Sequence, residues 1–337
     1  MMKTERESLN GQGFTVIREA ADGQGEDGVF AATHAGGGFL CVADGCGGSG
    51  ARRYAKLDGR TEACCASRIA VECAEAWARE GGNAAPPSTA GEARVRADRL
   101  AAALRDRLTA FHARYRNDPA GGKILANGFI RTLPTTLCLA QLDARDARRL
   151  SCVFYWAGDS RGYLLCADGL RQCTADHTAG RPDAMENLYR DARLSNVVNA
   201  DGPFRIDTFG LTVSKPCVAL TVTDGAYAYL PTPMEFELLL LKTLEASPSL
   251  HGWRTRLSHA FAKTAGDDAS LALACFGAES FEALKACLAP RRAAFQARYV
   301  TPVRRRGQNV AFARALWAEY RQGYEMLGED YHADWRL

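Results

Sequence analysis

The sequence lacks a long apolar segment, since none of its apolar runs approaches the roughly 18 residues that a membrane-spanning helix needs. It also lacks an excess of charge of one sign: the formal net charge of 337 residues is +3, which argues against a nucleic-acid partner. Its N-terminus, residues 1–8, has no apolar region after its charged residues, so we expect no signal peptide, and the lack of long apolar runs predicts no membrane partner.

Cysteine is plentiful, with 12 residues, but no two of them have the C-x-x-C spacing of a zinc or redox site. Several lie inside apolar, strand-like runs, where a thiol behaves as a small core residue: Cys41, Cys138, Cys152, Cys217 and Cys275. We therefore expect a cytoplasmic protein with reduced cysteines and no disulfide framework. With 47% hydrophobic and 24% charged residues, the chain is globular and can bury a sizeable core.

One stretch, residues 39–48, stands out because a buried-looking strand, Phe39 to Ala43, runs directly into Asp44 and then a cluster of glycines. A carboxylate held at the end of a buried strand is costly unless positive charge lies beside it. Glycines allow a sharp turn that leaves backbone carbonyls open to a ligand. This combination suits a hard metal ion with oxygen ligands.

The remaining pattern predicts a mixed α+β protein. Strand-like runs occupy residues 14–18, 29–34, 39–43, 135–142, 150–157, 162–166, 170–174, 217–223 and 270–276. Helical periodicity predicts two long paired helices between 61 and 117, and further helices at 235–244 and 252–264. The four strands between 135 and 174 have no helices between them, which predicts an antiparallel meander. We expect residues 1–12 to be mobile and residues 178–208 to form a surface flap.

Acidic residues recur where these strands begin or end: Glu26, Asp27, Asp44, Asp159, Asp224 and Asp267. An isolated Asp-Gly pair usually only turns the chain. Strands of one sheet lie side by side, however, so acids at their ends can converge at one edge, where divalent cations would relieve their repulsion. All-oxygen ligation indicates Mg²⁺ or Mn²⁺ rather than zinc.

The ordered set of motifs resembles the bacterial branch of the protein phosphatase 2C family. The motifs are Glu26-Asp27, Ala43-Asp44-Gly45-Cys46-Gly47-Gly48, Thr135-Thr136, Gly158-Asp159-Ser160-Arg161, Asp176-His177, Thr223-Asp224-Gly225 and Asp267-Asp268. The resemblance implies a catalytic domain at residues 13–277 with a four-layer α-β-β-α sandwich, a central antiparallel β-sandwich flanked by helices. Residues 278–337 lie outside it, as an additional helical segment. His177 is expected to have a structural role.

The resemblance also implies metal-dependent hydrolysis of phosphoserine and phosphothreonine in proteins by a hydroxide that bridges two Mn²⁺ or Mg²⁺ ions. Asp44 would bridge both ions, Gly45 would offer its carbonyl to one, and Asp224 and Asp267 would complete the other, which makes the three aspartates the catalytic set. Glu26 would hold a metal-bound water with support from Asp27. Asp159 matches the position linked to a third, weaker ion. The implied partner is a phosphoprotein substrate that a serine/threonine kinase has phosphorylated.

The sequence departs from the family pattern where an arginine that grips the phosphate usually precedes the Glu-Asp pair. Residues 21–25 contain no basic side chain, so Arg18, Arg52, Arg53 and Arg161 are the candidates to replace it. Cys46 stands where the family has methionine or histidine, and it is expected to be a spacer rather than a nucleophile.

Two other functions remain open at this point. Residues 45–50 match the dinucleotide-binding pattern G-x-G-x-x-G, but Asp44 would repel a pyrophosphate and Asp58-Gly59 interrupts the helix that should follow. Alternatively, the missing arginine and the added segment would suit a pseudophosphatase that binds a phosphoprotein with little turnover. Retention of Asp44, Asp224 and Asp267 argues against that alternative.

The C-terminal extension, residues 278–337, is basic and aromatic. Nine arginines and five acids follow Ala289, which gives this segment a net charge of +4. Phe312, Leu316, Tyr320 and Tyr324 fall four apart and form an aromatic helical stripe. We expect this stripe to pack on the catalytic domain with the arginines in solvent, the alternative being an acidic protein partner or nucleic acid.

Overall fold

The structure is a computed structural model that describes residues 8–80, 85–118, 120–121, 131–179, 183–189, 193–307 and 309–327. Residues 1–12 were expected to be mobile. Residues 1–7 lie outside the described ranges, whereas Leu9 is buried in the core. Within the described ranges, no helix combines the length and apolar character needed to cross a membrane.

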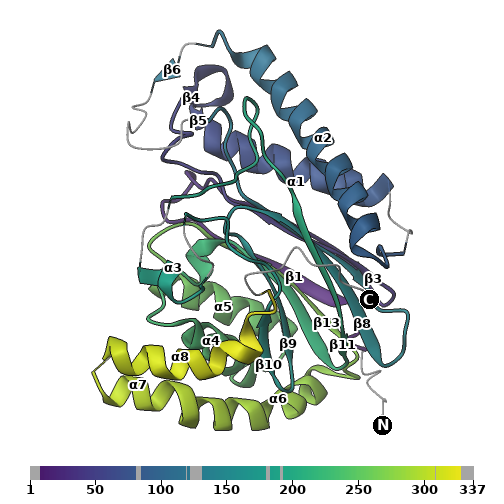
Figure 1. Cartoon of the computed structure of the whole chain (residues 1–337), viewed down its shortest axis with the longest axis vertical. Coiled ribbons are helices and arrows are strands. Elements are labelled where there is room, and N and C mark those ends of the chain that lie inside the picture. The colour runs from purple at the N-terminus through teal and green to yellow at the C-terminus, as the bar shows by residue number, and fades with distance from the viewer. Residues whose placement is uncertain are drawn as a thin grey trace.

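Two five-stranded antiparallel sheets form the centre of the molecule (Figure 1). Sheet A has the order β1 (Gln12–Arg18), β13 (Ala269–Phe276), β12 (Cys217–Val222), β9 (Arg161–Cys166) and β10 (Gly169–Gln172). Sheet B has the order β11 (Asp207–Ser214), β8 (Arg149–Ala157), β7 (Leu137–Asp143), β3 (Gly37–Ala43) and β2 (Gly28–His34). Cysteine, alanine and branched residues from both sheets fill the space between them, as expected for strands buried on both faces.

Helices cover the outer face of each sheet. Sheet B is covered by α1 (Glu62–Glu80) and α2 (Ala90–Tyr115), and sheet A by α4 (Pro233–Glu245) and α5 (Leu250–Thr264). Shorter elements are β4 (Arg53–Tyr54), η1 (Ala55–Leu57), β5 (Arg60–Thr61), β6 (Ala120–Gly121), α3 (Glu186–Tyr189) and η2 (Asp224–Ala226). The predicted four-layer α-β-β-α arrangement is confirmed.

The strands between residues 135 and 174 do not form one meander. β7 pairs with β8 in sheet B, whereas β9 pairs with β10 in sheet A. The chain therefore crosses between the sheets at residues 158–160, and Gly158 has a φ of 95°, a conformation that glycine adopts readily. The prediction was wrong because alternation within a strand does not reveal which sheet it joins. The crossing places Asp159 between the two sheets.

The segment 178–208, expected at the surface, is partly buried. Val198 is fully buried, and its backbone pairs with that of Thr135 through N–O distances of 2.9 and 3.0 Å. The strand β11, which begins at Asp207, was not predicted because its buried positions, Asp207, Gly210 and Val213, are three residues apart and do not alternate. Residues 180–182 and 190–192 of this segment lie outside the described residues.

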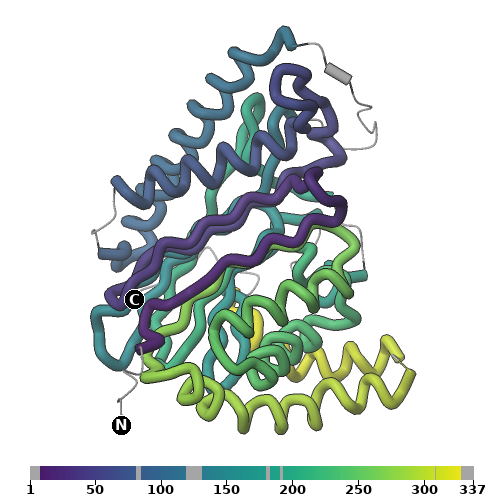
Figure 2. Tube along the Cα trace, turned by 180° about the vertical axis from the view of Figure 1, so that it is seen from behind, coloured from purple at the N-terminus to yellow at the C-terminus, as the bar shows by residue number. Residues whose placement is uncertain are grey.

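The C-terminal extension folds back on the helices of sheet A (Figure 2). It contains α6 (Phe281–Phe295), the π-helical turn η3 (Gln296–Val300), α7 (Thr301–Arg305) and α8 (Val310–Tyr324). Trp317, Tyr320 and Tyr324 of α8 are buried in the same core cluster as α4 and α5, so the aromatic face packs on the domain as expected.

Several arginines of the extension form ion pairs instead of lying free in solvent. Arg291 donates to Glu237 of α4 at 2.6 Å, and Arg304 pairs with Glu235 of the same helix. Helix α4 therefore presents acidic side chains to the basic extension. The basic charge of the extension serves in part to attach it to the domain.

Candidate functional site

Sheet B brings two of its acidic motifs to one edge. Gly28, the first residue of β2, lies opposite Ala43, the last residue of β3. Glu26-Asp27 and Asp44 therefore extend from the same end of neighbouring antiparallel strands. The carbonyl of Glu26 accepts a hydrogen bond from the amide of Gly45 at 3.2 Å, which joins the two motifs directly.

Sheet A contributes Asp224 and Asp267 at the same end of the sandwich. Val222, at the end of β12, lies opposite Leu271, near the start of β13. A hydrogen bond of 2.9 Å between the Thr223 hydroxyl and Oδ2 of Asp27 joins this edge to that of sheet B. The strand ends of both sheets thus converge.

The backbone of Asp44 is held by the two threonines of the next strand. Its amide donates to Oγ1 of Thr136 at 3.0 Å, and its carbonyl accepts from the Thr136 amide and the Thr135 hydroxyl, both at 2.8 Å. Both threonines are fully buried. The next residue, Gly45, lies so close to the backbone of Ala63 that a Cβ at this position would be 2.4 Å from the carbonyl oxygen of Ala63.

Glu26 and Asp27 lie in a loop that Asp268 fastens. The two carboxylate oxygens of Asp268 accept hydrogen bonds from the amides of Ala20 and Glu26, at 2.7 and 2.6 Å. The Thr61 hydroxyl donates to the Glu26 carboxylate. Asp27 is buried, and its Oδ1 has no hydrogen-bond partner among the residues that the structure describes.

Asp224 begins the 3₁₀ turn η2, where its carbonyl accepts from the amides of Tyr227 and Ala228 at 2.9 and 2.7 Å. The next residue must be glycine, because a Cβ at Gly225 would lie 1.9 Å from the carbonyl oxygen of Asp268. This contact keeps Asp224 close to the Asp267-Asp268 motif.

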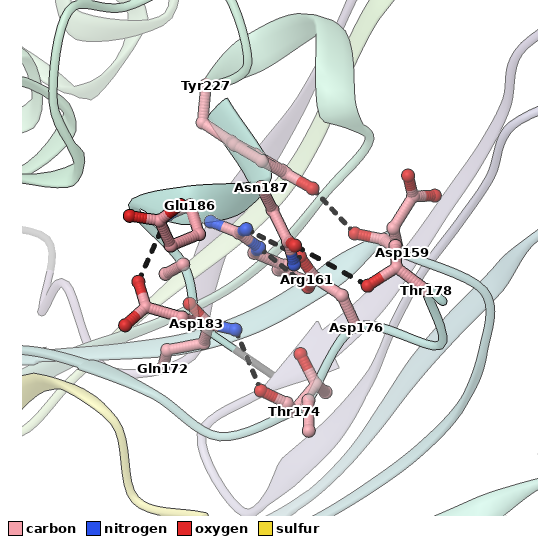
Figure 3. Close-up of polar contacts among 12 residues, drawn as sticks. Asp159, Arg161, Gln172, Thr174, Asp176, Thr178, Asp183, Glu186, Asn187 and Tyr227 are labelled. Atoms are coloured by element: carbon pink, nitrogen blue, oxygen red, sulfur yellow. Dashed lines mark hydrogen bonds and ion pairs between the residues drawn. The ribbon is translucent and has the colours of Figure 1, made fainter. Parts of the chain in front are cut away.

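Asp159 lies on the crossing between the sheets and is fixed from both sides. The Tyr227 hydroxyl donates to its carbonyl at 2.7 Å (Figure 3). Nδ1 of His177 accepts the amide of Gly158 at 3.1 Å, and its Nε2 lies 2.9 Å from Oδ2 of Asp207. His177 is therefore structural, as predicted. It supports the loop that carries Asp159.

Mutual repulsion and burial shift the titration of the gathered carboxyl groups. Burial raises the pKa values of Asp44 and Asp159 well above their usual range, and the charge of Asp224 raises both further. Burial also raises the pKa values of Asp27 and Asp224, each to about 7. Asp267 is exposed, but its charge acts on Asp44 and Asp224.

The six predicted acids are thus close enough to affect one another's charge, and five of them are at least half-buried. Within the described ranges, however, no three histidine, cysteine, aspartate or glutamate side chains already form a coordination set for a metal ion. Carboxylates repel one another without a cation between them. The donor set still fits a hard cation, since it consists of carboxylates, the Gly45 carbonyl and the unpartnered Oδ1 of Asp27.

The four candidate arginines are placed very differently. Arg161 is buried, and its guanidinium donates to both oxygens of Asp176, at 2.8 and 2.6 Å, so it does not fit the predicted phosphate contact. Arg52 donates to the carbonyls of Arg116 and Asp118 and is also engaged.

Arg53 and Arg18 remain at the surface. Arg53 is exposed and donates to the carbonyl of Gly59 at 2.8 Å. Burial raises the pKa of Glu26, and the positive charge of Arg53 acts in the opposite direction and lowers it. Arg18 forms an exposed pair with Asp22 at 3.4 Å. Arg53 is therefore the candidate whose charge reaches the acidic site.

The surroundings of Cys46 in the metal-free protein disfavour a nucleophilic thiolate. Burial raises the pKa of its thiol well above its usual range, and the negative charges of Asp44, Asp159, Asp224 and Glu26 raise it further. A thiol that stays protonated is a poor nucleophile. This supports the interpretation of Cys46 as a spacer.

Several residues that build the site were present in the motifs without an assigned role. They are Thr136, Thr223 and Asp268, which hold the acidic loops in place. Their position beside the acids in the motif order was the available signal. Hydrogen bonds between distant segments cannot be read from one sequence.

No protein-family model matches the sequence, and no curated protein matches it either. The fold, in contrast, matches solved serine/threonine phosphatases. The Mycobacterium tuberculosis phosphatase PstP/Ppp is 21% identical with a TM-score of 0.51, over 79% of this chain and 98% of that chain. The Staphylococcus aureus phosphatase Stp1 is 16% identical with a TM-score of 0.54, over 82% and 98%.

A Caenorhabditis elegans (C.elegans) sex-determining protein is 13% identical with a TM-score of 0.57, over 83% of this chain and 67% of that chain. At these identities the likeness establishes the fold. The chain therefore has the fold of the bacterial serine/threonine phosphatases, the one that its motifs resemble.

Proposed function

We propose that this protein is a divalent-metal-dependent phosphatase that hydrolyses phosphoserine and phosphothreonine in proteins. The observation that carries the proposal is the convergence of Asp44, Asp159 and Asp224, from both sheets, on one end of a phosphatase fold. Burying like charges together is costly and serves no structural purpose, so selection for a site with perturbed pKa values is the better explanation.

The acids would hold two Mg²⁺ or Mn²⁺ ions. Asp44 would lie between them, the Gly45 carbonyl would contact one, and Asp224 and Asp267 would contact the other. Asp159 would contact a third ion, and Glu26 and Asp27 would orient bound water. A pair of such ions lowers the pKa of water, which makes hydroxide available near neutral pH, and neutralises charge on the phosphoryl oxygens.

The chain's own groups would orient the substrate and protect the site. Arg53 is proposed to contact the phosphate, since its charge already acts on Glu26 and its side chain is exposed. Arg18 is a less favourable candidate because it lies in an exposed pair with Asp22. The neutral thiol of Cys46 would fill the space beside Asp44 without competing as a nucleophile.

The partner and compartment follow from the same proposal. We expect a phosphoprotein substrate, the product of a serine/threonine kinase, and we propose a cytoplasmic location because all 12 cysteines are free.

Hydrolysis of a phosphothreonine peptide tests the proposal, with EDTA, Mg²⁺ or Mn²⁺ in parallel reactions. We expect turnover that requires metal and is lost in Asp44→Ala and Asp224→Ala, with Asp143→Ala, an acid outside the site, as the control. Metal binding without turnover would favour the pseudophosphatase. Neither binding nor turnover would refute the proposal.

A further inference from the structure

The end of the C-terminal extension is built into the central sandwich. After α8, Glu325 pairs with Gln172 of β10, and the amide of Met326 donates to the Gln172 carbonyl at 3.0 Å. Leu327 then enters the core between the two sheets and is 5% exposed. Helix α8 is therefore attached to sheet A, the sheet that contributes Asp224 and Asp267.

Tyr324, the last residue of α8, connects this helix to a buried arginine. Its hydroxyl lies 3.0 Å from that of Tyr163, to which Nη1 of Arg161 donates at 3.3 Å. All three side chains are buried. The guanidinium of Arg161 thus reaches the extension through one tyrosine.

Arg161 in turn supports the loop that carries Asp159. Its guanidinium lies 3.9 Å from the centre of the Tyr227 ring, and it pairs with both oxygens of Asp176. The hydroxyl of Tyr227 donates to the carbonyl of Asp159, as Figure 3 shows. A continuous chain of contacts therefore leads from α8 to the acidic site.

A second route from α8 ends on the same ion pair. Arg321 pairs with Asp183 at 2.9 Å, and the Glu325 carboxylate accepts the amide of Ala184 at 2.8 Å, which fixes the start of the segment 183–189. Asn187 of this segment donates to Oδ2 of Asp176 at 2.6 Å. Asp176 is therefore held by Arg161 on one side and, through this segment, by α8 on the other.

The network is sensitive to the loss of any member because it surrounds a buried charge. A buried guanidinium is tolerated only when its donors are satisfied, and an unpartnered buried hydroxyl costs more than a lost contact at the surface. Hydrogen bonds in such a chain also strengthen one another. Removing the Tyr324 hydroxyl leaves the Tyr163 hydroxyl with one partner fewer, and we expect this loss to weaken the support that Tyr163 gives to Arg161.

We propose that Tyr324 is a positioning residue: helix α8 fixes the Asp159 loop through Tyr163, Arg161 and Tyr227. The extension would then be part of the site's support rather than a separate module. The consequence for metal-dependent hydrolysis rests on the proposed function, whereas the structural coupling does not.

Hydrogen exchange in the metal-free protein tests the coupling directly. The amides of Gly158 and Gly162 report on the loop, because they donate to His177 and Thr174. We expect Tyr324→Phe and Tyr227→Phe to accelerate their exchange about fivefold, which corresponds to about 1 kcal/mol. Tyr320→Phe is the matched control, since it removes another buried hydroxyl of α8 that bonds Glu237 instead.

The inference would be overturned if both amides exchanged at the wild-type rate in Tyr324→Phe. It would also be overturned if Tyr320→Phe accelerated their exchange equally, because that result would indicate a general loosening of α8. Mn²⁺ titrations of activity give a second readout: Tyr324→Phe should raise the Mn²⁺ concentration needed for half-maximal rate more than it lowers kcat. A wild-type protein that hydrolyses nothing would refute the proposed function, while the exchange result would still decide the coupling.

Discussion

Replacing Asp27 by asparagine should stabilise the metal-free protein at neutral and alkaline pH. Asp27 is 5% exposed, and its Oδ2 accepts a hydrogen bond from the Thr223 hydroxyl, whereas no described residue bonds its Oδ1. Asparagine has nearly the same shape and keeps an oxygen acceptor for Thr223. The substitution therefore removes the buried charge with little change in packing.

The expected size follows from the pKa of Asp27, which burial raises from 3.8 to about 7. A group whose pKa is higher in the folded protein contributes stability below its unfolded pKa and loses it as the pH rises through the folded value. The stability of wild type should therefore fall between about pH 4 and pH 7. The full difference of about 3 pKa units corresponds to about 4 kcal/mol of stability. This value is an upper limit, because the titration of Asp27 is coupled to that of the neighbouring acids.

Urea unfolding in EDTA at pH 5 and pH 8 measures the effect. We expect Asp27→Asn to exceed wild type by about 1–4 kcal/mol at pH 8 and by less at pH 5. Asp143→Asn is the control with the opposite sign, because the hydrogen bond from Arg145 lowers the pKa of Asp143. A variant of Asp27 that is less stable than wild type at pH 8 would refute this reasoning, because it would show that the ionised carboxylate supports the fold.

Three further outcomes are expected. Arg53→Ala should raise KM for a phosphopeptide about tenfold with little change in kcat, because one charge-assisted hydrogen bond is lost. Arg18→Ala should leave KM unchanged, and equal effects of the two substitutions would exclude a specific phosphate contact. Cys46→Ser should retain hydrolysis, and iodoacetamide should not inhibit the wild type, since the thiol stays protonated; loss of rate in both tests would contradict this. Leu327→Ala should lower the free energy of unfolding, measured by urea denaturation, by about 2–4 kcal/mol, because this side chain fills the core between the sheets. An unchanged free energy would show that the end of the extension is not packed there.

The acidic end of the sandwich could be predicted because its signal is local. Each acid lies within two residues of the end of a strand, as the sequence predicted for Asp44-Gly45 and Asp224-Gly225. Antiparallel pairing then brings the ends of neighbouring strands to one edge. The four-layer fold was implied by the resemblance to the protein phosphatase 2C family, and the predicted helices between residues 61 and 117 agreed with it.

The role of Arg161 could not be predicted from the sequence. It was a candidate to replace the missing phosphate-binding arginine, yet it is the first residue of β9 and its side chain is buried against Asp176. Whether a polar side chain at a strand end faces the interior depends on which sheet the strand joins. The same uncertainty made the crossing between β8 and β9 look like an ordinary turn.

The extension was predicted in part. The four-residue spacing of Tyr320 and Tyr324 indicated a buried helical face, and both are buried. Their hydroxyls bond Glu237 and Tyr163, which lie 83 and 161 residues away in the chain. Such contacts depend on the completed fold, so no local pattern indicates that α8 approaches the acidic site.

Calorimetric titration of the metal-free protein with Mn²⁺ near pH 6.5, in buffers of different ionisation enthalpy, tests the central claim most directly. Ions that bind among carboxyl groups with raised pKa values must displace protons, so the measured heat should depend on the buffer, and binding should be lost in Asp44→Asn. Absence of Mn²⁺ binding, or binding that Asp44→Asn leaves intact, would contradict the assignment of this acidic cluster as a metal centre.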